Sequence, residues 1–83
     1  MLYIVPQQPG TGAQMLRRLA RLEEQIINVD AHITRQLLIV AQLERAGFPA
    51  RSARGILAGF DTIREESIAE RDRIRALLDQ VTG

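Results

Sequence analysis

The chain has no cysteine and no lysine, and only 4% of its 83 residues are aromatic. Without cysteine it has no disulfide framework, no thiolate metal site and no cysteine nucleophile, which fits a reducing compartment. All basic residues are arginines, and the formal net charge is +1. So small a net charge provides no strong field to steer nucleic acid or an acidic substrate toward the protein.

Long apolar runs are also missing. The longest run, residues 37–41, is far shorter than the roughly 20 residues that span a bilayer. The N-terminus lacks a positive region before its apolar stretch and has no convincing cleavage site. We therefore expect no membrane span, no signal peptide and a cytoplasmic location.

Apolar residues recur at alternating spacings of three and four in two stretches, Met15–Leu43 and Ala53–Val81. The stretches are mirror images about Phe48. This pattern predicts an all-α protein, an antiparallel two-helix hairpin with coiled-coil-like packing. The seam pairs expected from the mirror are Met15/Val81, Leu19/Leu77, Leu22/Ile74, Ile26/Glu70, Val29/Ser67, Ile33/Ile63, Gln36/Phe60, Val40/Ile56 and Leu43/Ala53.

The expected organisation is an extended N-terminal arm over 1–12 and a helical hairpin over 13–83. Within the hairpin we expect helices at about 13–46 and 49–80, joined by a turn at 47–49. Gly47 suits the left-handed conformation that ends a helix, and Pro49 suits the first position of the next helix. The apolar segment Leu2–Val5 is interpreted either as a frayed terminus or as an arm that packs on the hairpin or on a partner chain.

Charged positions beside the seam provide a separate test of the hairpin. The predicted flank pairs include Glu23/Arg71, Asp30/Arg64, Gln25/Arg73 and His32/Glu66, and none sets like charges against each other. Glu70 falls in the seam itself. It is expected either to bend out to solvent or to reach Arg73 or an arginine of another chain, and whether it is buried is left open.

The turn region contains Leu43-Glu44, Gly47, Ala53, Ile56-Leu57 and Phe60. With these residues it resembles a group of short bacterial helical-hairpin proteins of unknown function. In that group a glycine-containing run joins two helices, and an apolar stretch with a phenylalanine opens the second helix. The resemblance implies a helical hairpin and implies no activity.

Catalytic and metal-binding patterns are weak. His32 is the one histidine, and Asp30, two residues away, lies on a different helical face. Ser67 falls in the predicted seam without a histidine to act as its base, which favours a packed hydroxyl over a nucleophile. Because no Glu-x-x-His pair or phosphate-binding glycine loop occurs, we predict a protein that is not an enzyme and has no metal or cofactor.

Nucleic-acid association is the alternative function, either as a nucleic-acid-associated or as a regulatory protein. Arginines cluster at both ends of the predicted hairpin and could contact phosphates. The turn cluster is Arg45, Arg51 and Arg54. The candidate anion contacts at the open end are Arg17, Arg18, Arg21, Arg73 and Arg75.

A second apolar stripe on the first helix is the best indication of function. It faces away from the second helix, which cannot cover it, and small chains with one thin core often oligomerise. We therefore predict a self-associating hairpin, most simply a two-fold dimer that forms a four-helix bundle, although an unnamed protein partner could cover the same stripe. The predicted interface residues are Ile27, Ala31, Thr34, Leu38 and Ala41.

Two glycines in the second predicted helix, Gly55 and Gly59, each lower helix stability by ~1 kcal/mol relative to alanine. Two explanations stay open. Gly59 makes room for Ile39 of the facing helix, or the pair lines a smooth groove that receives another helix.

Overall fold

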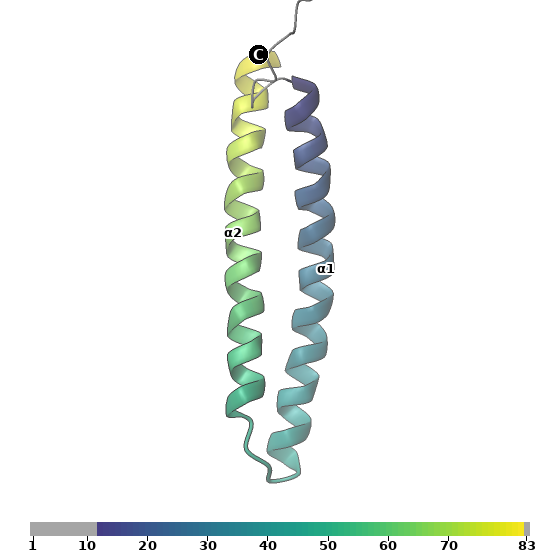
Figure 1. Ribbon diagram of the computed structural model, residues 1–83, viewed down its shortest axis with the longest axis vertical. Coiled ribbons are helices and arrows are strands. Elements are labelled where there is room, and N and C mark those ends of the chain that lie inside the picture. The colour runs from purple at the N-terminus through teal and green to yellow at the C-terminus, as the bar shows by residue number, and fades with distance from the viewer. Residues whose placement is uncertain (1–11, 83) are drawn as a thin grey trace, which may run out of the picture.

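A computed structural model describes residues 12–82 of the chain and shows two α-helices packed side by side (Figure 1). Helix α1 spans Gly12–Arg45 and helix α2 spans Arg51–Thr82, with opposite directions. The all-helical hairpin predicted from the sequence is confirmed. The predicted arm lies outside the described residues except for Gly12.

The turn between the helices ends α1 with a glycine in the left-handed conformation. Gly47 has a φ of 80°, and its N–H donates to the carbonyl of Glu44 at 3.1 Å. The N–H of Phe48 donates to the carbonyl of Leu43 at 2.9 Å. These two bonds form a Schellman motif, which satisfies carbonyl groups that the end of α1 would leave without partners.

Helix α2 begins at Arg51 rather than at the predicted Pro49. The backbone N–H of Arg54 donates to the carbonyl of Ala50 at 2.8 Å, so Ala50 occupies the N-cap position. Ala50 is buried, and it packs with Val40 and Ala53 in a small apolar cluster that Leu43 borders. This cluster closes the turn end of the hairpin.

The face of α1 that contacts α2 is the one predicted. Its buried residues all belong to the predicted seam and repeat at helical spacing. Gln36 is among them, and its Nε2 donates to the carbonyl of Ala53 at 2.9 Å. The buried residues are Met15, Ile26, Val29, Gln36 and Val40.

The contacting face of α2 is rotated from the predicted one. Ala53, Ser67 and Ile74 are buried as expected, but four other predicted seam residues are exposed. Their places toward α1 are taken by neighbours one position on, such as Leu57 and Leu78, which are half-buried. The exposed seam residues are Ile56, Ile63, Leu77 and Val81.

Candidate functional site

The outer stripe of α1, defined as Ile27, Ala31, Thr34, Leu38 and Ala41, lies away from α2. Ile27 is 69% exposed and Leu38 is 60% exposed. Ala31 and Thr34 are also exposed, whereas Ala41 is half-buried. The Thr34 hydroxyl donates to the carbonyl of Asp30 at 3.1 Å, so this polar group already has a partner within α1. The stripe therefore offers another molecule a mainly apolar surface.

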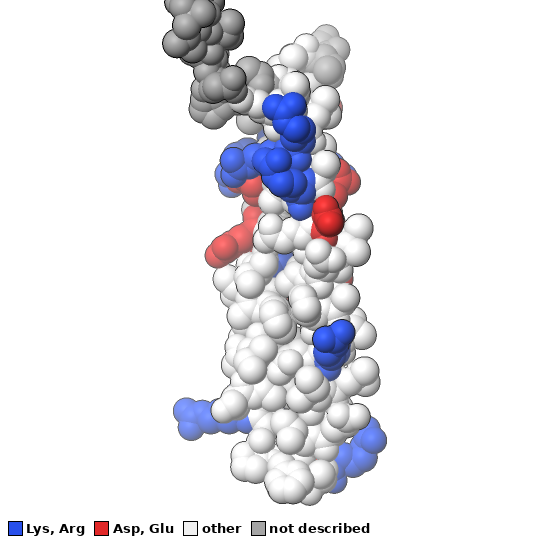
Figure 2. All heavy atoms as spheres, turned by 45° about the vertical axis from the view of Figure 1, so that its right-hand side comes forward, with Lys and Arg blue, Asp and Glu red and all other residues white. Residues whose placement is uncertain are grey.

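Figure 2 brings the α1 side of the molecule forward. Much of the surface between the open end and the turn is uncharged, and acidic and basic side chains gather near the open end. Charged side chains do border the outer stripe, because Glu24 lies one helical turn from Ile27 and Arg35 lies one turn from Leu38.

A second partly apolar face involves both helices. On this side the His32 ring stacks on the Phe60 ring, with centroids 5.3 Å apart and planes inclined by 16°. Gln25 Nε2 donates to Ser67 Oγ at 3.1 Å on the same side. We define the stacked face as this pair of rings with the exposed isoleucines around it: His32, Ile39, Ile56, Phe60 and Ile63.

Sequence reasoning missed the stacked face because it placed Ile56 and Ile63 in the seam. It also paired His32 with Glu66 and Gln25 with Arg73. The rotation of α2 instead brings Phe60 and Ser67 to these two residues. The sequence signal that could have identified this face is the pair Ile56 and Ile63, which are seven residues apart. They form a second row beside the seam, which has the same seven-residue repeat.

The two glycines of α2 lie in open space. A Cβ atom added to Gly55 or Gly59 would meet no atom within 4 Å. The explanation that Gly59 makes room for Ile39 is therefore wrong, because no atom of residues 12–82 packs closely on that glycine. The alternative, a groove for another helix, stays a prediction.

The candidate anion contacts at the open end are largely engaged by carboxylates. Arg18 and Arg73 both bind Glu70, at 3.1 and 2.5 Å. Glu70 therefore reaches Arg73, as one of the expectations had it. Among the residues that the structure describes, Arg17 and Arg21 have no ion pair. Arg18 and Arg21 line an open hollow of about 250 Å³ with Leu22 and Gln25.

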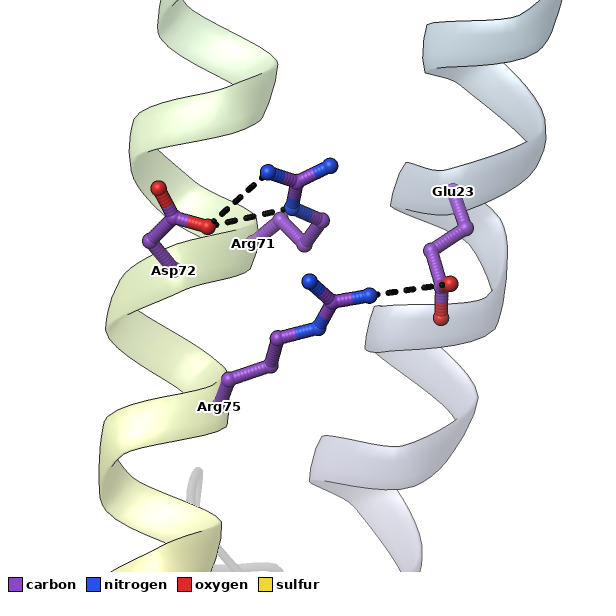
Figure 3. A network of polar contacts seen from close by, with 4 residues as sticks. All are labelled: Glu23, Arg71, Asp72 and Arg75. Atoms are coloured by element: carbon purple, nitrogen blue, oxygen red, sulfur yellow. Dashed lines mark hydrogen bonds and ion pairs between the residues drawn. The ribbon is translucent and has the colours of Figure 1, made fainter.

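Figure 3 shows how charged side chains connect the helices near the open end. Arg75 of α2 donates to Glu23 of α1 at 3.3 Å, whereas Arg71 binds its neighbour Asp72 at 3.0 Å. The predicted Glu23/Arg71 pair is thus wrong by one helical turn. The predicted Asp30/Arg64 pair is confirmed at 2.6 Å, and Glu44 pairs with Arg54 at the turn end.

Residues 12–82 contain no group of three or more His, Asp or Glu side chains able to hold a metal ion. Ser67 is buried, and its hydroxyl oxygen accepts the bond from Gln25. In the same part of the chain, neither helix contains a stretch apolar and long enough to cross a membrane.

No family model, curated protein or solved structure matches this chain. The resemblance to bacterial helical-hairpin proteins therefore stays a prediction, and the functional argument depends on the surfaces described above.

Proposed function

We propose that the hairpin is a non-enzymatic protein-protein interaction or scaffold module that self-associates through the outer stripe of α1. Two copies would pair about a two-fold axis and form a four-helix bundle. The observation that supports this proposal is the high exposure of Ile27 and Leu38 on the side of α1 that faces away from α2.

The physical reason is the hydrophobic effect. Fully burying one leucine or isoleucine side chain is favourable by about 1.5–3 kcal/mol. The contacts of α2 leave this gain unused at Ile27 and Leu38, because α2 packs on the opposite side of α1. Ala31 and Thr34, which lie between them on the stripe, would allow a second helix to approach closely.

The partner in this proposal is a second copy of the chain, and the contact needs no metal or cofactor. The cytoplasmic location and the bacterial origin expected from the sequence stay predictions. A different protein that covers the same stripe is the competing outcome.

Light scattering of the purified chain tests the proposal. The wild-type mass at tens of micromolar should be at least twice the 9.3 kDa of one chain. Leu38→Glu places a charge in the contact without touching the seam, so the mass should fall while circular dichroism shows that helical content survives.

Leu37→Glu is the matched control. Leu37 is 52% exposed, and on a helix it lies on the same flank as Asp30 and Glu44, about 100° from Leu38. This variant should keep the wild-type mass. A monomeric wild type, or a Leu38→Glu variant with undiminished mass, would contradict the proposed interface.

A further inference from the structure

The turn between the helices exposes an aromatic side chain between two arginines. We define the tip as residues 46–49, all of which are exposed. Phe48 is 63% exposed, although phenylalanine is among the residues most often buried in proteins. Arg45 ends α1 and Arg51 begins α2. Within residues 12–82 neither of these arginines has an ion pair, so both are available to another molecule.

Formal charge is unequally distributed along the hairpin. Residues 35–60, which include the turn, contain four arginines and one glutamate, a formal charge of +3. The rest of the chain contains seven arginines and nine acidic residues, a formal charge of −2. The face drawn in Figure 2 shows basic side chains on both sides of an uncharged tip. A negatively charged surface therefore attracts the turn end of the hairpin and repels the other part.

The backbone N–H groups of the tip need no water. Ala46, Gly47 and Phe48 donate theirs to carbonyls of α1, at 3.0, 3.1 and 2.9 Å, and Pro49 has none. An unpaired N–H group is costly to remove from water, which keeps most turns out of apolar surroundings. This cost is absent here. For the same reason the tip offers a phosphate group none of the N–H donors with which many turns bind anions.

We propose that the tip docks end-on to the surface of a lipid bilayer that carries anionic headgroups. Phe48 enters the layer where headgroups meet acyl chains, and Arg45 and Arg51 contact the headgroups. This contact goes beyond the self-association proposed above, and it uses no residue of the outer stripe.

The chemistry of the tip selects this partner. An apolar side chain between basic ones matches the boundary of an anionic bilayer, where apolar chains lie directly beneath negative headgroups. A bilayer also receives a projecting side chain without a pocket of complementary shape. A nucleic acid would attract the same arginines, and the bases of a single strand could stack on Phe48. The paired N–H groups of the tip favour the bilayer, and binding of a single strand is the competing outcome.

Sedimentation with lipid vesicles tests the contact. The wild type should sediment with vesicles of phosphatidylcholine and phosphatidylserine, less so as salt rises, and weakly with vesicles of phosphatidylcholine alone. Phe48→Ala should weaken binding about tenfold. Replacing both Arg45 and Arg51 by alanine should weaken it roughly 25-fold, since one basic residue near such a surface contributes about fivefold. A wild type that does not sediment with the mixed vesicles overturns the proposal.

Matched controls lie at the open end of the hairpin. Replacing both Arg17 and Arg21 by alanine removes the same charge as the tip variant, and neither arginine has an ion pair within residues 12–82. Val81→Ala shortens an apolar side chain that is 68% exposed. Both controls should bind as the wild type does, and circular dichroism follows helical content in every variant. Equal weakening by the two arginine pairs would show that binding follows net charge, which overturns docking through the tip.

Tryptophan fluorescence tests insertion without removing the aromatic group. The chain has no tryptophan, so an introduced one is a unique reporter. Emission of Phe48→Trp should shift to shorter wavelength when the mixed vesicles are added, and emission of Val81→Trp should not. An unshifted Phe48→Trp spectrum overturns the proposal. A shift with single-stranded DNA or RNA but not with vesicles overturns it too, and assigns the tip to nucleic acid. None of these variants changes the outer stripe, so the results are independent of the light-scattering test.

Discussion

Gln36 and Ser67 are polar residues in the seam, and each has a hydrogen-bond partner on the other helix. Gln36 donates to the carbonyl of Ala53, and Ser67 accepts from Gln25. A buried polar group without a partner would cost about 1–3 kcal/mol. Because these groups are satisfied only when the facing residues are in place, they favour one alignment of the helices over its neighbours.

The burial of both residues confirms that they lie in the seam, whereas the sequence predicted no hydrogen-bond partner for either. The sequence placed Gln36 opposite Phe60 and Ser67 opposite Val29. Hydrophobic spacing identifies which residues turn inward, but it does not tell which backbone carbonyl or side-chain amide lies within bonding distance. That detail depends on the rotation of α2, which spacing alone does not determine.

Gly47 and Gly55 should respond in opposite ways to replacement by alanine. Gly47→Ala should lower the free energy of unfolding by about 1–2 kcal/mol, because its φ of 80° is unfavourable for a residue with a Cβ. Gly55→Ala should raise it by about 1 kcal/mol, because the site is helical and the added Cβ has open space.

Urea titrations of both variants at one fixed protein concentration check this pair, since self-association makes apparent stability depend on concentration. A stabilised Gly47→Ala variant would show that the turn is not a Schellman motif. A Gly55→Ala variant less stable than the wild type would show that another molecule needs the space beside this glycine.

At the scale of the helices, α1 could be predicted and α2 only in part. The apolar residues on the inner side of α1 form one continuous row, so its face is unambiguous. Adjacent apolar pairs occur in both helices, but in α2 both members of pairs such as Ile56-Leu57 and Leu77-Leu78 lie near the side that faces α1. Two seams one position apart therefore fit the same spacing, and the mirror argument chose the one that the structure exposes.

The choice between these two seams depends on α1. The observed rotation places Leu57 toward α1 and leaves Ile56 outside. In this arrangement Phe60 stacks on His32 and Ser67 receives the bond from Gln25. The spacing of apolar residues within one helix does not show which side chains of the other helix it contacts. These two contacts therefore could not be predicted from that spacing.

Charge reversal tests the alignment of the helices. Glu23→Arg should destabilise the hairpin by about 0.2–1 kcal/mol, as expected for an exposed ion pair. Adding Arg75→Glu should restore the loss, because Arg75 is the partner of Glu23. Adding Arg71→Glu should give no rescue, since Arg71 binds Asp72 on its own helix.

Melting temperatures of the wild type, the single variants and both double variants form the comparison. Rescue by Arg71→Glu instead of Arg75→Glu would mean that the helices are aligned as the sequence mirror predicts. The Asp30–Arg64 pair is a useful reference, because the sequence and the structure agree on it.

At the scale of the whole molecule, the outer stripe was predicted and its residues are exposed as expected, apart from the half-buried Ala41. To predict the outer stripe, it was enough to know which face of α1 lies opposite its seam. To predict the stacked face, the rotation of α2 relative to α1 would also have been required. The hairpin therefore exposes more apolar surface than sequence spacing indicated, and this strengthens the reasoning that leads to self-association.

The charge distribution of the whole molecule leads to the last prediction, which concerns nucleic acid. The open-end arginines would have to neutralise phosphates to bind DNA or RNA. Three of them, Arg18, Arg73 and Arg75, already bind Glu70 or Glu23, so a phosphate would have to displace a carboxylate. We expect no measurable binding of duplex DNA or single-stranded RNA at physiological ionic strength.

Fluorescence anisotropy with labelled oligonucleotides at several salt concentrations is the measurement. Glu70→Gln is the informative variant, because it frees Arg18 and Arg73 and raises the net charge by one. If it gains weak binding that fades as salt rises, the carboxylate suppresses phosphate binding in the wild type. Micromolar binding by the wild type, weakened steeply by salt and lost in an Arg17→Ala, Arg21→Ala variant, would favour the nucleic-acid function over the interaction module. Those two arginines have no ion pair within residues 12–82, so they are the ones a phosphate would reach without competition.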